Sequence, residues 1–103
     1  MRIYIAAPYS GGDMAMNVRR AIGFADLMLN MGHFPFVPHL THFWHMLCPQ
    51  TYETWLQYDR EWLVACDAIL RLPGDSPGAD REVEWAREAG LRVFMDIQEI
   101  PHG

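Results

Sequence analysis

Apolar residues follow two different patterns along this chain. In short segments they form nearly unbroken runs, rich in β-branched and aromatic residues, which is typical of strands covered on both faces in a parallel sheet. In longer segments they recur every third or fourth position, which indicates amphipathic helices. The predicted strands are Arg2–Ala7, Phe34–Val37, Asp67–Arg71 and Leu91–Met95.

Helices are predicted between these strands. The first spans Asp13–Met31, with Asp13 as its N-cap, and the second spans Thr51–Cys66. The third follows the turn-rich stretch Pro73–Gly78 and ends at Gly90. Spacing at i, i+3, i+4 and i+7 places four of its residues on the face toward the sheet, namely Glu82, Trp85, Ala86 and Ala89. The inner stripe of the first helix is predicted to hold Ala21, Ala25, Met28 and Leu29.

Strands and helices that alternate with short loops predict a single α/β domain over residues 1–103. We expect a flavodoxin- or Rossmann-like three-layer sandwich around a four-stranded parallel sheet of order 2-1-3-4, with Pro35 keeping the second strand short or at an edge. In this order the first and third strands are neighbours. The loops that follow them, Pro8–Gly12 and Pro73–Gly78, then face one crevice at the carboxyl ends of the strands, where α/β proteins bind ligands.

Glu82 is the most unusual residue near this crevice. A carboxylate on the inward edge of a first helical turn is costly to bury without a partner. Two interpretations are open at this point. Glu82 either serves a ligand site or merely complements the positive end of the helix dipole.

The connection Pro38–Pro49 is rich in aromatic residues and contains His39, His42 and His45, spaced by threes. One hypothesis is a metal site. However, this spacing does not hold three ligands on one helical face, and no acidic residue or cysteine is adjacent to complete the site. We therefore favour a substrate-facing lid or an interface, and we predict neither a metal nor a cofactor.

Composition narrows the class of protein. The chain has 103 residues, and half of them are hydrophobic, so it is predicted to fold as a globular domain. Its formal charge of −5 argues against a nucleic-acid polymer as a partner, because proteins that bind one usually carry a basic face. A free nucleotide remains a possible partner, because a helix N-terminus can hold phosphate. Cys48 and Cys66 form no metal motif. No signal peptide and no membrane-spanning run is visible, so we expect a cytoplasmic protein without membrane contact.

Four segments in this order resemble the nucleoside 2-deoxyribosyltransferase-like superfamily: YIAAPYSGG, a PHL turn, CDAILRLPG and SPGADREVEWA. The resemblance extends from Tyr4 to about Val93. The superfamily includes deoxyribosyltransferases, nucleoside 5′-monophosphate N-glycosidases and small domains of unassigned function. It implies that residues 1–103 form one nucleoside 2-deoxyribosyltransferase-like domain.

The resemblance also implies catalytic residues. In the family, a glutamate at the start of the helix after the third strand attacks C1′ of the sugar and displaces the base. Glu82 matches this glutamate, and Tyr4 matches a tyrosine that positions it. Asp67 matches an aspartate near the base and sugar, although from its place before a strand alone it would be interpreted as a solvated cap.

Six residues before the glutamate, the deoxyribosyltransferases have an acidic residue and the monophosphate glycosidases a serine, and this chain has Ser76. The resemblance therefore implies a phosphate site. This chain has Ser10 where the glycosidases often carry an arginine, which Arg19 or Arg20 is a candidate to replace. The residues expected to hold substrate are Ala6, Pro8, Tyr9, Ser10, Gly11, His39, Ser76, Pro77 and Gly78.

The predicted function is N-glycosidic cleavage of a (deoxy)nucleoside 5′-monophosphate. The alternatives are base exchange by a nucleoside 2-deoxyribosyltransferase and nucleotide binding without turnover. A nucleoside or nucleotide is the expected partner. Together with the family precedent, Trp44, Trp55 and Trp62 predict a homodimer or a larger homo-oligomer.

Overall fold

The computed structural model describes residues 1–103 and contains one parallel sheet of order β2-β1-β3-β4, as predicted. Tyr4 at the centre of β1 pairs with Phe36 of β2 on one side and Ile69 of β3 on the other. The strand that contains Pro35 lies at an edge, where the missing N–H of proline breaks no ladder. The strands are β1 (Arg2–Ala6), β2 (Phe34–Phe36), β3 (Ala68–Arg71) and β4 (Arg92–Phe94).

Each of the three long helices begins at a residue whose side-chain oxygen accepts a backbone N–H, because the first N–H groups of a helix have no partner within it. These caps are Asp13 before α1 (Met14–Asn30), Thr51 before α3 (Tyr52–Val64) and Ser76 before α4 (Pro77–Glu88). The remaining helical segments are short, namely η1 (Pro38–Leu40), α2 (Thr41–Leu47) and η2 (Ile97–Glu99).

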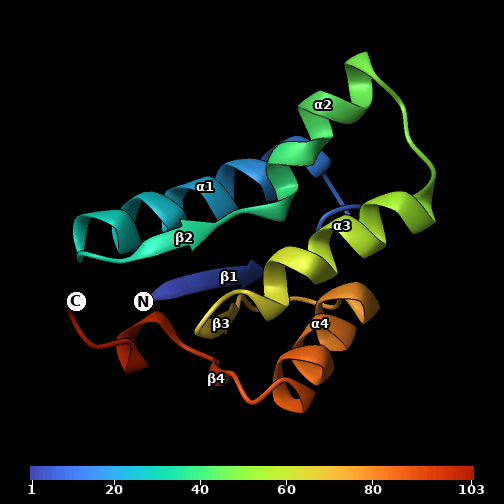
Figure 1. Ribbon diagram of the computed structural model, residues 1–103. Helices are drawn as coiled ribbons and strands as arrows, with labels where there is room; N and C mark the ends of the chain where they lie inside the picture. The colour runs from blue at the N-terminus through green and yellow to red at the C-terminus, as the bar shows by residue number, and fades with distance from the viewer.

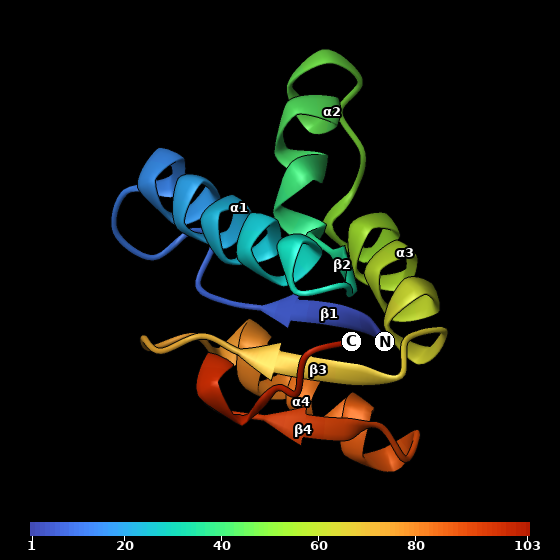
Figure 2. The ribbon, with the colours of Figure 1, turned by 90° about the vertical axis from the view of Figure 1, so that its left-hand side faces the viewer.

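The sheet is the middle of three layers (Figure 2). One face packs against α1 and the C-terminal segment, and its core includes Ile3, Ile5, Met28 and Phe94. The other face packs against α3 and α4. This second core contains Tyr4, Ala6, Leu63, Ile69, Ala79, Val83 and Ala86.

The inward faces of two helices are narrower than the sequence pattern predicted. In α1, Leu29 is exposed and the buried residues are Val18, Ala21, Ala25 and Met28. Ala89, the C-cap of α4, is exposed, whereas Ala79 and Val83 within the helix are buried beside Ala86. A helix on a sheet buries a stripe of limited width, so residues next to the stripe remain at its rim. Glu82 and Trp85 occupy such half-buried positions.

The segment after η1 forms a helix, α2, which projects from the three-layer body (Figure 1). None of its residues is buried, although Phe43, Trp44, Met46 and Leu47 are large and apolar. None of the helices combines the length and the apolar character that crossing a membrane requires.

Candidate active site

A cavity of about 700 Å³ opens at the carboxyl ends of β1 and β3. Its walls are the loop after β1, the segment from η1 to the start of α3, and the beginning of α4. Nine of the predicted site residues line it, namely Pro8, Tyr9, Ser10, Gly11, His39, Ser76, Pro77, Gly78 and Glu82. The two Gly- and Pro-rich loops therefore share one crevice, as the predicted strand order required.

The two loops touch at Gly74. This residue has a φ of +121°, and a Cβ placed on it would lie 2.8 Å from Cγ of Pro8. Only glycine fits here without strain, because the backbone conformation and the close approach both exclude a side chain. The loop after β3 is therefore held directly against the loop after β1.

Glu82 lies in the cavity wall and accepts a hydrogen bond from the Tyr4 hydroxyl. Tyr4 is fully buried beneath it and stacks on Phe36 at a centroid distance of 5.6 Å. Burial raises the pKa of Tyr4 well above its usual value, and the neighbouring Glu82 raises it further. The hydroxyl is therefore a permanent hydrogen-bond donor to the carboxyl group.

The pKa of Glu82 is raised from 4.5 to about 7, chiefly by burial. The hydrogen bond from Tyr4 opposes this rise, as do the charges of Arg81 and Arg71, whereas Asp59 adds to it. A carboxyl group that titrates near neutral pH is half ionised there, and burial leaves it poorly solvated. Carboxyl groups with pKa values shifted this far are enriched at functional sites. The Glu82 carboxyl group turns inward to Tyr4, so the hydrogen bond explains its position without a role for the helix dipole.

Asp59 of α3 also lines the cavity, and the sequence analysis did not single it out. Burial raises its pKa from 3.8 to about 7, and its Oδ1 atom is buried without a hydrogen-bond partner. A signal was present in the sequence. Asp59 lies four residues after Trp55 and three before Trp62, so it is an acid in the middle of an aromatic stripe.

Arg81 is a further charged residue of the cavity that the sequence did not single out. It donates to the Tyr52 hydroxyl at 2.8 Å and lies over the ring of Trp85. Among the residues that line the cavity it is the only arginine, and there is no lysine, whereas Asp59, Asp75 and Glu82 are acidic. The cavity is therefore acidic apart from this one guanidinium and two histidines.

Three predicted site residues do not line the cavity, namely Tyr4, which is buried beneath Glu82, and two residues that lie farther from it, Asp67 and Ala6. The prediction for Asp67 is wrong in position, since its carboxylate accepts from the backbone N–H of Arg2 at 2.8 Å, at the amino edge of the sheet. Because parallel strands run in one direction, a residue just before β3 is at the opposite edge from the loop after it. Ala6 is fully buried in the sheet, and its neighbour Ala7 lines the cavity instead.

The three histidines have separate partners. His39 donates through Nε2 to the carbonyl of Pro8 at 3.0 Å, and His42 pairs with the Tyr9 hydroxyl. His45 accepts from the indole N–H of Trp55 at 2.8 Å. No three His, Cys, Asp or Glu side chains in the fold converge as metal ligands would. His39 and His45 line the cavity, and burial lowers the pKa of His39, so it is neutral at pH 7.

Backbone N–H groups of both loops are free to bind a ligand. Those of Ser10, Gly11, Asp75, Ser76 and Gly78 donate no hydrogen bond within the protein. Consecutive unpaired N–H groups beside a helix N-terminus form a concave site for anions. Behind the first loop, the amide of Asn17 holds the carbonyls of Tyr9 and Gly11 at 2.9 and 2.7 Å.

Two solved structures share this fold. One is a 2-deoxyribosyltransferase from Bacillus psychrosaccharolyticus, with a TM-score of 0.70 and 17% identity over 94% of this chain and 76% of that one. The other is a 2-desoxiribosyltransferase from Leishmania mexicana, with a TM-score of 0.68 and 20% identity. The match covers 89% of this chain, and the chain spans only 61% of the Leishmania enzyme. The resemblance found in the sequence is thereby confirmed at the level of the fold.

No curated protein matches the sequence. The sequence model of one protein family matches residues 1–96, which is nearly the whole chain. The chain therefore belongs to the family described as a domain of unknown function (DUF7768), and it adopts the fold of the nucleoside 2-deoxyribosyltransferases.

Proposed function

We propose that the protein is a glycosidase that cleaves the base–sugar bond of a nucleoside 5′-monophosphate, with Glu82 as the nucleophile. The observation that carries the proposal is the pair formed by Tyr4 and Glu82 in the wall of the cavity. A half-buried carboxyl group with a pKa of about 7 and one fixed hydrogen-bond donor is suited to attack a sugar carbon.

In the proposed first step, a carboxylate oxygen of Glu82 attacks C1′ and forms a glycosyl ester. The bond between C1′ and the base nitrogen breaks, and its electron pair leaves with the base. Asp59 is the candidate acid that protonates this nitrogen, because its pKa of about 7 keeps a proton available at neutral pH. The transition state resembles an oxocarbenium ion, which the carboxylates of the acidic cavity stabilise.

In the second step, water attacks C1′ and releases Glu82, and the Asp59 carboxylate takes the proton that the water loses. The products are a free base and a sugar 5-phosphate. The cycle needs Glu82 ionised and Asp59 protonated at the same time. Since both pKa values are about 7, the two groups titrate as a pair, and activity should peak near neutral pH.

The unpaired N–H groups of both loops support a phosphate at the sugar 5′ position. Ser76 ends the loop after β3 and caps α4 by accepting from the N–H of Ala79 at 3.1 Å, so its own hydroxyl hydrogen is available to a phosphate oxygen. The aromatic residues Tyr52 and Trp55, on the α3 side of the cavity, would frame the base.

Base exchange between nucleosides is the second candidate. The observation that favours base exchange is that Asp75 lines the cavity beside Ser76. A carboxylate there would repel phosphate and would accept a hydrogen bond from a free 5′-hydroxyl. The nucleophile is the same in both candidates, so only the acceptor of the sugar differs.

The test is base release from a panel of ribo- and deoxyribonucleosides and their 5′-monophosphates, followed by chromatography with and without a second free base. A glycosidase releases base from monophosphates without an acceptor, whereas a transferase forms a new nucleoside only when the acceptor is present. Glu82→Gln should abolish both reactions. Glu84→Gln is the matched control, because Glu84 is an exposed acid on the same helix and pairs only with Arg87. Binding without turnover by the wild type across the panel would leave a nucleotide-binding module.

We also propose that the chain forms a homo-oligomer. The support is the apolar surface of α2, which includes Trp44, together with Trp62 of α3; these two residues are 48% and 49% exposed. Light scattering after gel filtration tests this, and a monomer at micromolar concentration would contradict it.

A further inference from the structure

Arg71 is a buried cation outside the cavity. It is the last residue of β3 and is 8% exposed, and it lies on the sheet face that α4 covers. A guanidinium in such a place requires partners for its charge and its donors. It does not line the cavity, so the proposed substrate contacts do not explain it.

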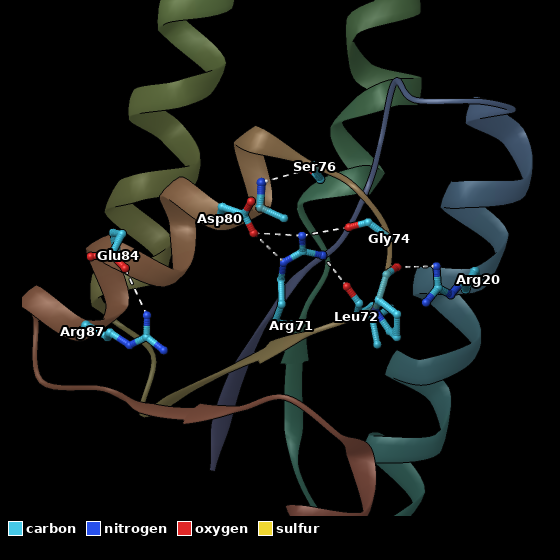
Figure 3. Close-up of polar contacts among 10 residues, drawn as sticks. Arg20, Arg71, Leu72, Gly74, Ser76, Asp80, Glu84 and Arg87 are labelled. Atoms are coloured by element: carbon cyan, nitrogen blue, oxygen red, sulfur yellow. Dashed lines mark hydrogen bonds and ion pairs between the residues drawn. The ribbon is translucent and has the colours of Figure 1, made fainter.

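The guanidinium binds groups from two segments (Figure 3). In the loop after β3, it donates to the carbonyl of Gly74 at 2.9 Å and to the carbonyl of Leu72. In the first turn of α4, it donates to Oδ1 of Asp80 at 3.0 Å through Nη2 and at 3.3 Å through Nε. One side chain therefore joins the end of a strand, the loop that follows it and the helix that carries Glu82.

A second arginine acts on the same loop from the other side. Arg20 of α1 donates to the carbonyl of Pro73 at 2.9 Å, so the carbonyls of three consecutive residues accept from arginines (Figure 3). In a planar trans peptide, the C=O and N–H groups point in opposite directions. Because the Gly74 carbonyl points at Arg71, the N–H of Asp75 points away from it, and this N–H is unpaired.

We propose that Arg71 is a positioning residue that aims the loop N–H groups and the first turn of α4 at one phosphate group. Through the Leu72 and Gly74 carbonyls it sets the direction of the loop, and through Asp80 it sets the start of the helix. Glu82 follows Asp80 by two residues, so the same contact places the nucleophile relative to the anion site. The nature of the ligand rests on the proposed function.

The fork of the guanidinium and its charge have separable effects. Lysine keeps the charge but cannot bind two carbonyls and a carboxylate from one planar group, whereas methionine loses both properties. The charge of Arg71 acts on the pKa of Glu82. Burial and Asp59 raise this pKa, whereas the hydrogen bond from Tyr4 and the charges of Arg81 and Arg71 lower it. Arg71→Lys and Arg71→Met therefore separate geometry from electrostatics.

The probe is inorganic phosphate, titrated while the backbone amide signals of Asp75, Ser76 and Gly78 are followed by NMR. In the wild type these signals should shift together. Arg71→Lys and Arg71→Met should each weaken phosphate binding about tenfold, the effect of losing one charge-assisted hydrogen bond. Arg87→Lys is the matched control, since Arg87 pairs with Glu84 on the exposed side of α4, and it should bind as the wild type does.

The second readout is the pKa of Glu82, measured from its carboxyl carbon. It should stay in place in Arg71→Lys and rise in Arg71→Met. Wild-type phosphate affinity in Arg71→Lys, or no amide shifts in the wild type, would overturn the proposal. If both Arg71 variants fail to fold, Asp80→Asn decides, because this carboxylate is at the solvent side of the pair and 72% exposed. Weaker phosphate binding in Asp80→Asn supports the proposal, and unchanged binding overturns it.

Failure of the proposed function has a different signature. A wild-type protein that binds phosphate at these amides but releases no base from any nucleoside or nucleotide would refute glycosidic cleavage and leave the role of Arg71 intact. If the wild type and Arg71→Lys cleave nucleotides with equal efficiency, the role of Arg71 is refuted and glycosidic cleavage is supported.

Discussion

Replacing Tyr4 by Phe should shift the pH dependence of the proposed reaction to higher pH. The change removes only the hydroxyl group, which donates a hydrogen bond to Glu82. The ring remains, so the stacking on Phe36 and the buried core are kept. The hydrogen bond from Tyr4 lowers the pKa of Glu82 from the still higher value that burial alone would impose. Its loss should therefore leave the carboxyl group protonated at neutral pH.

The magnitude follows from the strength of the bond. A hydrogen bond to a charged group contributes about 1.5–3 kcal/mol, which corresponds to a rise of about one to two pKa units. With a starting pKa of about 7, half of Glu82 is ionised at pH 7 in the wild type. In Tyr4→Phe this fraction falls to between about one tenth and one hundredth, so kcat at pH 7 should fall roughly 5- to 50-fold.

The assay is kcat for base release from pH 5 to pH 10. Because alkaline pH also removes the Asp59 proton, kcat of both proteins should fall there. The deficit of Tyr4→Phe relative to the wild type should narrow from about 10- to 100-fold at pH 5 toward equality at pH 10, as Glu82 becomes ionised in both proteins. Tyr58→Phe is the control, because Tyr58 belongs to the aromatic residues of α3 but makes no hydrogen bond to Glu82. A uniform fall in kcat at every pH, with the acid limb in place, would refute the link between Tyr4 and the ionisation of Glu82.

Four further outcomes are expected. Glu82→Gln should raise thermal stability at pH 8 but not at pH 4. The Glu82 carboxyl group keeps its proton up to about pH 7 in the folded protein but loses it near pH 4.5 in the unfolded chain. Ionisation therefore destabilises the folded state by up to roughly 3 kcal/mol as the pH rises from about 4.5 to about 7. A thermal denaturation series against pH measures this, and an equal gain at both pH values would contradict it. Asp59→Asn should slow base release and remove the alkaline limb of the pH profile, and an unchanged alkaline limb would exclude Asp59 as the acid. Ser76→Ala should lower stability by about 1 kcal/mol through loss of the cap and raise KM for monophosphates more than for nucleosides, and equal effects on both substrates would argue against a phosphate site. Asp67→Asn should leave kcat unchanged, since its carboxylate lies at the amino edge of the sheet, and a large loss would restore the role that the resemblance implied.

The sheet order could be predicted because the signals were local and consistent. Unbroken apolar strands, helices between them and a proline in the second strand together leave few other topologies. The same order correctly brought the loops after β1 and β3 together, and with them Ser10, Ser76 and Glu82.

The differences between the predicted and the observed site have separate causes. Asp67 was placed by motif rather than by strand direction, and its position before β3 already put it at the wrong edge. Asp59 was overlooked because Trp55 and Trp62 on either side of it were assigned to an oligomer interface, although an acid between such aromatic residues is partly removed from solvent. The sequence predicted a lid or an interface over Pro38–Pro49 but not a helix there, because the segment is short and its apolar residues follow no clear helical spacing.

The hydrogen bond between Tyr4 and Glu82 joins residues 78 positions apart, from the first strand to the last long helix. Contacts of such sequence separation close late, after the intervening segments have docked. A chain still emerging from the ribosome, or one arrested in a partly assembled state, therefore carries Glu82 as an ordinary solvated acid. The pair on which the proposed reaction depends therefore exists only in the completed fold, so under the proposed function nucleotide turnover would report how much of a preparation is native.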